Sequence, residues 1–271
     1  MLPSAFTYPC SPQPTQSATH SPPDDILTSW YSELPNHPDP VTPLTLENNE
    51  ILWQATRISL NWKGNSLFEG VASGTPYEDD LNNFYTAVTE NPGYIVNLAN
   101  RFSYMGLEKE KNEEFCTNRN IQFQFAGSSF CGTGMVATSR SLTLNNCPDQ
   151  IPSLEVTGWG SMQGLNPDDI HHLISWYLPY KHKSGIVHCY QGLGRTGVFI
   201  IAAALYQQHT HTPLTQEVLR PLIDNLITQA RKQRDPKVIE SGGQYACLYR
   251  YGEWLCKGLN DKQPDKPAAS S

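Results

Sequence analysis

The sequence predicts an α/β (α+β) fold in which a central mixed sheet is flanked by helices. Short apolar runs of strand length alternate along the chain with longer amphipathic or apolar segments of helical length. One apolar run ends in a cysteine and a glycine-rich turn that leads directly into a long apolar segment, SGIVHCYQGLGRTGVFIIAAALY, residues 184–206. No internal repeat is visible, so the strands and helices are expected to surround one sheet.

Composition divides the 271 residues into a central domain and two tails. Residues 1–47 are rich in proline, serine and threonine, which predicts a disordered N-terminal segment. Residues 48–258 carry the strand and helix patterns and are long enough for one sizeable core, so they are the expected catalytic domain. Residues 259–271 form a polar C-terminal tail.

The first half of the central domain predicts strands and one amphipathic helix. The helix is expected at residues 78–90, EDDLNNFYTAVTE, whose acidic residues fall in the first turn, where they favour the helix dipole. The run GYIVNLAN follows the turn sequence Asn-Pro-Gly and predicts a buried strand. Strands are expected at residues 56–62, 66–72, 93–100, 121–127 and 134–146.

The second half predicts helices around one further buried strand. The segment NPDDIHHLISWYL opens with Asn166 as the N-cap and Pro167 at the first helical position. The next amphipathic stretch, residues 213–231, is expected to break or restart at Pro221, because proline lacks the amide that donates an intrahelical bond. The remaining elements are a buried strand at 184–189, a nearly all-apolar helix at 194–209 and a closing helix at 242–259.

Charge and cysteine usage exclude several classes of function. The net charge of −7 argues against nucleic acid or an anionic membrane as a partner for the whole surface. No apolar run reaches the roughly 20 residues of a membrane helix, and the N-terminus lacks the features of a signal peptide. The seven cysteines are odd in number and contain no Cys-x-x-Cys pair, so no disulfide framework or zinc site is expected. This usage fits a cytoplasmic, reducing compartment, and a bacterial effector exported into a host cytosol would show the same pattern.

The chemistry concentrates in HCYQGLGRTG, residues 188–197. Such a strand–turn–helix points successive backbone amides into one concavity, and the helix N-terminus adds partial positive charge, which together make an anion site. Gly192 and Gly194 allow the tight path and the close approach of an anion. A Walker-type loop would need Gly-Lys-Ser/Thr, whereas this chain has Gly-Arg-Thr. The expected phosphate-binding residues are Tyr190, Gln191, Gly192, Leu193, Gly194 and Arg195.

Cys189 and Arg195 are the expected catalytic pair. A thiol at the base of an anion nest is expected to exist as thiolate, and a thiolate that faces a bound phosphoryl group is positioned for covalent attack on phosphorus. Arg195 can hold two phosphate oxygens in a bidentate manner. Thr196 can donate its hydroxyl toward the sulfur, and His188 is expected to orient the turn. The alternative is an inert, buried structural cysteine.

This segment resembles the HC-x5-R-[S/T]-G signature of the cysteine-dependent protein tyrosine phosphatases, and the resemblance extends over much of residues 55–256. It implies a tyrosine-phosphatase-like fold and hydrolysis of phosphotyrosine, or dual specificity, in phosphorylated proteins, through a phosphocysteine on Cys189. No cofactor or metal is implied, and the pairs His171–His172 and His209–His211 lack the spacing of helix-borne metal ligands. The resemblance makes Trp159 a hinge anchor, Gln244 a residue that helps place water and Arg234 a brace for the phosphate loop.

The family's acid loop carries Trp-Pro-Asp, whereas this chain has Trp159-Gly160-Ser161. The missing aspartate protonates the leaving group, and a positioned acid or base is worth ~10²–10⁴-fold in rate. Asp168 and Asp169 lie just downstream, although first-turn helix acids are the more frequent role for such residues. Glu240 stands where a glutamine of the water segment is expected, and it either orients water, acts as a base or is an ordinary surface glutamate.

These departures leave two functions open. One is a phosphatase, and the other is a pseudophosphatase-like module that binds phosphorylated partners with little turnover. A sulfurtransferase is disfavoured, because its loop does not need this arginine spacing. The family's Asn-Arg-Tyr recognition string is absent near residues 35–60, where Tyr31 and Trp53 are the candidate aromatic walls. The sequence does not determine the oligomeric state.

Overall fold

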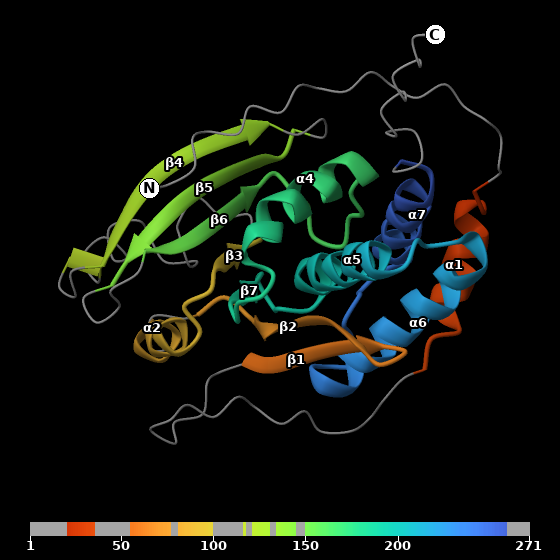
Figure 1. Cartoon of the computed structure of the whole chain (residues 1–271), viewed down its shortest axis with the longest axis horizontal. Helices are drawn as coiled ribbons and strands as arrows, with labels where there is room; N and C mark the ends of the chain where they lie inside the picture. The colour runs from red at the N-terminus through yellow and green to blue at the C-terminus, as the bar shows by residue number, and fades with distance from the viewer. Residues whose placement is uncertain are drawn as a thin grey trace, which may run out of the picture.

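A computed structural model of the protein describes residues 21–35, 55–76, 81–99, 116–117, 121–130, 134–144 and 150–258 (Figure 1). Its centre is a mixed seven-stranded sheet with the strand order β1-β2-β7-β3-β6-β5-β4. The strands are β1 Ala55–Trp62, β2 Asn65–Ser73, β3 Ile95–Asn97, β4 Gln122–Phe130, β5 Val136–Thr143, β6 Ile151–Thr157 and β7 Ile186–His188. The α-helices are α1 Asp24–Ser32, α2 Leu81–Glu90, α4 Pro167–Tyr177, α5 Gly194–His211, α6 Gln216–Gln233 and α7 Gly242–Gly258, and a 3-10 turn at Leu178–Tyr180 extends α4. This arrangement confirms the expected fold class.

The centre of the sheet is parallel and fully covered. The three-residue strand β7 lies between β2 and β3 and runs parallel to both. Every residue of β3 and β7 is buried, as expected for parallel strands with helices over both faces. Because parallel strands end at the same edge of a sheet, β7 delivers residue 189 to the edge where β2 and β3 also end.

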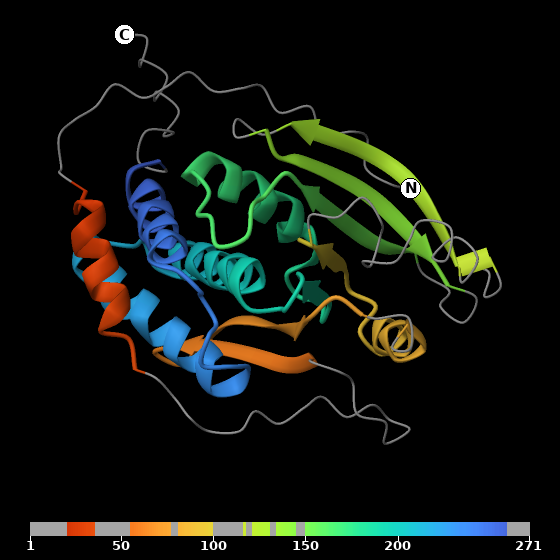
Figure 2. The same ribbon diagram turned by 180° about the vertical axis from the view of Figure 1, so that it is seen from behind.

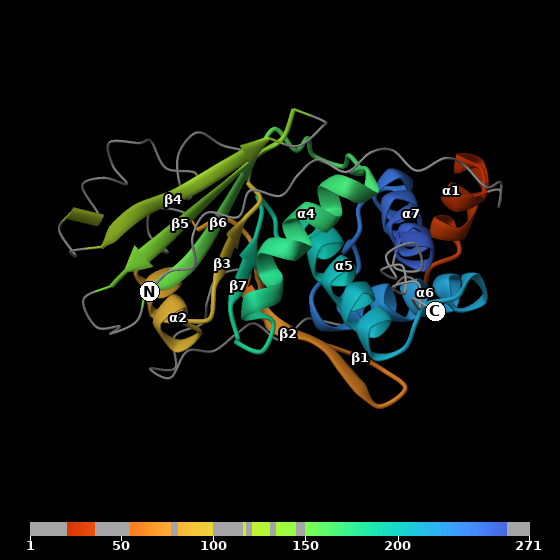
Figure 3. The same cartoon turned by 45° about the horizontal axis from the view of Figure 1, so that its top comes forward.

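Helices cover both faces of this centre. Alternate strand residues point to opposite faces, so that Val187 joins a core with α4, α5, α6 and α7, whereas Ile186 joins a smaller core with α2. Figures 1 and 2 show α5 in the middle of the larger helical layer, and Figure 3 shows α4 and α7 beside it. Helix α5 is buried along most of its length, which explains why its sequence is apolar on all sides.

The edge strand β1 pairs with β2 through a tight hairpin, in which Lys63 and Gly64 have φ of 48° and 86°. The backbone groups on the free side of β1 form hydrogen bonds with the side chains of two glutamines of α6. Gln233 accepts from the Ser59 amide at 2.8 Å, and Gln229 accepts from the Asn61 amide at 3.0 Å. Side-chain amides thus take the place of a further strand and protect this edge.

One expectation about the elements is corrected, and one strand is added. Helix α6 runs through Pro221 without a break. The proline lies on the exposed face, and the bond that it cannot donate would have gone to the carbonyl of Glu217, an exposed residue where water can replace it. Strand β6 is a run that the sequence analysis did not assign, and it contains Pro152. The parallel pairing with β3 begins one residue later, at Ser153, so the proline costs no bond in that ladder.

Residues 21–35 belong to the folded domain, which corrects the expectation of disorder for this part of residues 1–47. Helix α1 packs against α7, and the rings of Trp30 and Tyr249 lie edge to face at 5.4 Å. Arg220 of α6 lies over the Trp30 ring at 4.4 Å, and its guanidinium also bonds Glu33. Although its composition is rich in proline, this segment contains a short amphipathic helix, in which Leu27 is fully buried.

Other expectations agree with the structure where it describes them. Asn166 caps α4, because its side chain accepts from the Asp169 amide at 2.8 Å, and Pro167 occupies the first turn. The expected acidic first turn of α2 lies outside the described residues. Among the helices that the structure describes, none has both the length and the apolar character that a membrane crossing requires.

Candidate active site

Three carbonyl groups of the loop after β7 accept hydrogen bonds from residues that surround the loop. Thr75 donates its hydroxyl to the Cys189 carbonyl at 3.1 Å and its amide to the Tyr190 carbonyl at 3.1 Å. Arg234 donates to the Gln191 carbonyl at 3.2 Å. In a trans peptide the N–H points away from the C=O, so the following amides, those of residues 190–192, turn to the opposite side. The described part of the chain contains no cis peptide, so this geometry is compatible with the anion nest that the sequence predicts.

Two glycines of this loop are required by their surroundings. Gly192 has a φ of 74°, and a Cβ there would overlap the Ser73 carbonyl. A Cβ on Gly194 would overlap Glu240 Oε2 and would lie 2.6 Å from Gln244 Nε2. The absence of a side chain at both glycines thus lets β2 and the residues at the start of α7 pack directly against the loop.

Cys189 lies at the base of the nest, and only 3% of its surface is exposed. Thr196 is also buried, and its hydroxyl has no hydrogen-bond partner among the described residues. The four cysteines that the structure describes, Cys116, Cys189, Cys247 and Cys256, are free thiols.

Arg195 is buried and is oriented by the segment where the acid loop was expected. Its Nη1 donates to the Trp159 carbonyl at 3.1 Å. Trp159 is fully buried, and its indole donates to the Gln163 carbonyl at 3.0 Å, which closes the segment on itself. The Ser241 hydroxyl donates to the Met162 carbonyl at 2.7 Å and ties the same segment to the start of α7. Trp159 therefore anchors this loop beside the phosphate loop.

At the position of the missing acid the chain carries Ser161 instead of an aspartate. Ser161 is exposed. Asp169 is buried in the α4 cap, where its carboxylate accepts from the Asn166 side chain at 2.8 Å, and Asp168 is exposed in the same first turn. The structure therefore places both aspartates in the first turn of α4.

Arg234 braces the phosphate loop, as the resemblance implied. It is largely buried and donates to the Thr56 hydroxyl at 3.2 Å as well as to the Gln191 carbonyl. Burial lowers its pKa to about 10, an effect that nearby Asp235 and Cys189 oppose, so it remains charged at neutral pH.

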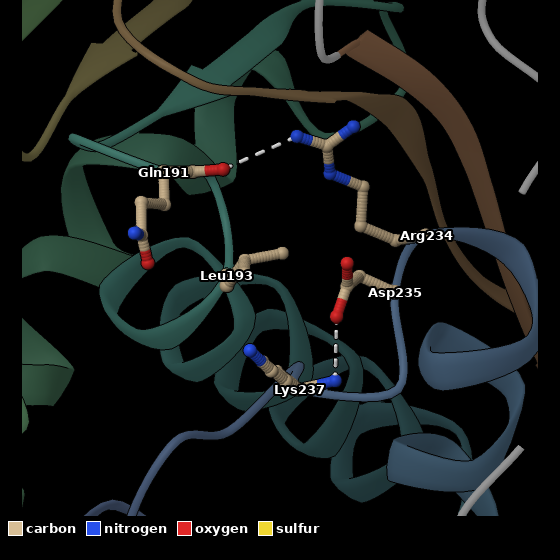
Figure 4. Close-up of a pocket in the computed structure, with 5 residues that line it drawn as sticks. All are labelled: Gln191, Leu193, Arg234, Asp235 and Lys237. Carbon is tan, nitrogen blue, oxygen red and sulfur yellow. Dashed lines mark hydrogen bonds between the residues drawn. The ribbon is translucent and has the colours of Figure 1, made fainter. Parts of the chain in front are cut away.

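A cavity of about 330 Å³ opens beside this brace (Figure 4). Its size is in the range of pockets that hold small ligands. The side chain of Leu193 and the backbone of Gln191 place the phosphate loop along one wall, so a substrate side chain could enter here (Figure 4). The lining residues are Gln191, Leu193, Arg234, Asp235 and Lys237.

Several candidates from the sequence lie elsewhere. Tyr31 does not wall this cavity: its hydroxyl donates to the Ile239 carbonyl at 3.0 Å, and its ring packs near Tyr245. Trp53 lies outside the described residues. His172 bonds the Ser129 hydroxyl, and His209 accepts from the Leu214 amide. Within the described ranges, no group of three histidine, cysteine or acidic residues could hold a metal.

The sequence analysis missed Thr75 and Ser241. Each acts through a contact with a residue more than 70 positions away in the chain, so no local pattern marks it. The only available signal for Thr75 was the Gly-Thr-Pro turn that follows the second strand.

His188 lies under the loop, fully buried, with its ring edge to face against Phe84 at 5.7 Å. Neither ring nitrogen has a hydrogen-bond partner among the described residues. Burial lowers the pKa of His188 to about 3. The imidazole is therefore neutral at physiological pH, and its ring packs against Phe84 beneath the loop.

This burial predicts a loss of stability in acid. The folded protein binds a proton at His188 more weakly than the unfolded chain, whose histidine pKa is near 6.5, so protonation favours unfolding. The contribution of His188 to the free energy of unfolding is constant above about pH 6.5 and decreases as the pH falls toward 3. At pH 5 the decrease is about 2 kcal/mol. Urea unfolding at pH 7 and pH 5 should show that His188→Gln loses about 2 kcal/mol less than the wild type. The exposed His182→Gln is the control, and an equal loss in all three proteins would contradict this account.

Comparison with known proteins supplies independent information. The sequence model of the family described as "Protein-tyrosine phosphatase" matches residues 64–252. This range contains the phosphate loop, Trp159, Arg234 and Gln244. A comparison with curated proteins found no significant match.

Solved structures share the fold. The protein tyrosine phosphatase TcPTP1 of Trypanosoma cruzi is 15% identical with a TM-score of 0.61, over 84% of this chain and 89% of that one. The protein tyrosine phosphatase TbPTP1 of Trypanosoma brucei is also 15% identical, with a TM-score of 0.62 over 86% of this chain and 92% of that one. At this identity the likeness establishes the fold, and the family match carries the assignment.

Proposed function

Because the chain belongs to the protein-tyrosine phosphatase family, we propose that it hydrolyses phosphotyrosine in phosphorylated proteins through a phosphocysteine intermediate on Cys189. The observation that carries this proposal is the loop around Cys189. Thr75 and Arg234 bind its carbonyls, which is expected to turn its amides toward the opposite side, and Cys189 is buried at its start. Arg195 is fixed beside it by the Trp159 carbonyl.

In the first step the Cys189 thiolate attacks phosphorus, the sulfur–phosphorus bond forms and the bond to the tyrosine oxygen breaks. The amides of the loop and the N-terminus of α5 hold the phosphoryl oxygens. Arg195 uses one N–H for the Trp159 carbonyl, and a guanidinium has five, so it keeps donors for two phosphate oxygens. The buried Thr196 hydroxyl is expected to donate to the sulfur when it becomes the leaving group.

The second step is hydrolysis of the phosphocysteine. Water attacks phosphorus, inorganic phosphate leaves and the thiolate is regenerated. No metal or other cofactor takes part in the proposed steps.

A second function has one observation in its favour. Ser161 replaces the expected acid, and both nearby aspartates occupy the α4 cap region. A protein that cannot protonate the leaving oxygen efficiently would act as a binding module for phosphorylated partners. Cys189, Arg195 and the glycine-containing turn between them are all present in the chain, and they favour the enzyme.

Leaving-group dependence tests this proposal. Without an acid the oxygen departs unprotonated, so the rate should rise steeply as the leaving group becomes more acidic. Activated aryl phosphates should turn over far faster than phosphotyrosine peptides, and phosphoserine peptides hardly at all, as measured by phosphate release. A flat dependence would mean that another acid serves, with Asp168, Asp169 and Glu240 the variants to make. Tight peptide binding with no phosphocysteine, even from activated esters, would establish the binding module.

A reducing compartment is the proposed setting, since the mechanism requires a free thiol at Cys189. The cytoplasm meets this requirement, and so does the cytosol of a host cell into which an effector is delivered. The catalytic domain proposed from the sequence, residues 48–258, gains α1 as a packed element in the structure.

A further inference from the structure

Two polar side chains at the start of α7 converge on Gly194, the residue that precedes Arg195. We propose that Glu240 is the catalytic base that takes a proton from the water that hydrolyses the phosphocysteine, the same water that the family resemblance expects Gln244 to help place. This inference rests on the proposed phosphocysteine mechanism. The family's aspartate is replaced by Ser161, so the residue that accepts the proton in the second step is not known. The proposal assigns this role to Glu240.

The position of the two side chains comes from the space around Gly194. A Cβ on this glycine would overlap Glu240 Oε2 and would lie 2.6 Å from Gln244 Nε2. A carboxylate oxygen and an amide nitrogen therefore both reach the surface of the phosphate loop. One is a proton acceptor and the other a donor, as a water molecule held between them requires.

The Gln244 side chain is fully buried, and only one end of its amide group has a hydrogen-bond partner among the described residues. Its Oε1 accepts from the Glu240 amide at 2.7 Å. This bond leaves Nε2 as the free end, and Nε2 has no hydrogen-bond partner among the described residues. An unpaired buried N–H is unfavourable, so it marks a place where a ligand or water is expected to bind.

The backbone on both sides of Glu240 is fixed by hydrogen bonds from several other segments. Ile239 has a φ of 62°, a left-handed conformation that is strained for a β-branched residue. The Tyr31 hydroxyl donates to its carbonyl, and buried Arg231 donates to the Val238 carbonyl at 3.1 Å. Ser241 bonds the Met162 carbonyl and also accepts from the Gln244 amide at 3.2 Å. A strained segment with so many constraints is typical of a functional position, and it fixes the carboxylate relative to the loop.

The proposed step balances as follows. The water oxygen forms a bond to phosphorus while one of its protons passes to the Glu240 carboxylate. The sulfur–phosphorus bond breaks, and its electron pair returns to Cys189 as thiolate. The products are monohydrogen phosphate and a protonated Glu240, which releases its proton to solvent before the next cycle. Gln244 donates to the water throughout and carries no proton away.

Glu240→Gln separates proton transfer from positioning, because the isosteric amide can still orient water but cannot act as the base. With p-nitrophenyl phosphate in stopped flow, the variant should release the first equivalent of nitrophenol at the wild-type rate. Steady turnover should then fall ~10²–10⁴-fold, with phosphocysteine accumulating. The matched control is Glu69→Gln, which removes the same charge from an exposed position on β2 and should match the wild type in both phases.

A second variant guards against a folding defect. Glu240→Ala should show the same slow second phase, and added formate should accelerate it by supplying a small carboxylate in the vacated space. Rescue of the second phase alone supports the base, since a structural defect would not respond to formate.

The outcomes separate the two proposals. If the wild-type protein forms no phosphocysteine from an activated ester, the proposed function fails. If phosphocysteine forms but the Glu240→Gln intermediate hydrolyses at the wild-type rate, or both phases slow equally and formate has no effect, Glu240 is not the base.

Discussion

Cys189→Ser is expected to abolish hydrolysis of every substrate while phosphopeptide binding persists. The substitution exchanges one side-chain atom at a site where only 3% of the residue is exposed, so the loop, its inward amides and Arg195 stay in place. Removal of an enzyme's nucleophile can cost on the order of 10⁶-fold in kcat. Phosphate release and isothermal titration with a phosphotyrosine peptide measure the two properties separately.

Two further variants control this experiment. Arg195→Ala should lose both binding and turnover, because it removes the bidentate donor and the contact to the Trp159 carbonyl. Cys256→Ser changes a partly exposed cysteine of α7 and should leave both properties intact. Turnover that survives in Cys189→Ser would remove covalent catalysis by this thiol from consideration.

Ser161→Asp is expected to raise turnover of phosphotyrosine peptides, by up to the ~10²–10⁴-fold that a positioned general acid supplies. The segment from Trp159 to Gln163 already lies against the phosphate loop, since the Trp159 carbonyl binds Arg195 and Ser241 holds Met162. We therefore expect a carboxyl at the exposed position 161 to reach the oxygen of the leaving group. Measurement of kcat on a phosphotyrosine peptide and on p-nitrophenyl phosphate should show the gain mainly on the peptide.

Ser161→Asn is the matched control, because it has nearly the same shape as aspartate and no acidic proton. It should leave both rates unchanged. Gly160→Pro can be added to Ser161→Asp to complete the family's Trp-Pro-Asp, although the ring must displace the Gln163 side-chain amide, which lies where a Cβ would be. No gain from Ser161→Asp, together with a flat leaving-group dependence in the wild type, would show that another group already serves as the acid.

The phosphate loop was predictable from sequence because its parts are adjacent in the chain. A buried strand, a turn with two glycines and a helix that begins at Gly194 occupy one continuous stretch, and each follows from local pattern. The N-cap of α4 was predictable for the same reason, since Asn166 bonds a residue three positions away.

The supports of the loop could not be predicted in this way. The Thr75 bonds to the loop and the Ser241 bond to Met162 join segments far apart in sequence. Helix α1 lies in a proline-rich stretch and owes its order to contacts with α6 and α7, as the Trp30 packing shows. Pro221 misled for a related reason: whether a missing amide matters depends on what lies opposite it, and this is set by tertiary structure.

The most direct test of the central claim is detection of the covalent intermediate. The wild-type protein would be mixed with a 32P-labelled activated aryl phosphate, stopped within milliseconds by a denaturing quench and digested for peptide mapping. The account predicts labelled phosphocysteine on the peptide that contains Cys189, formed before free phosphate and lost as phosphate appears. Release of phosphate without any label on Cys189 would contradict it.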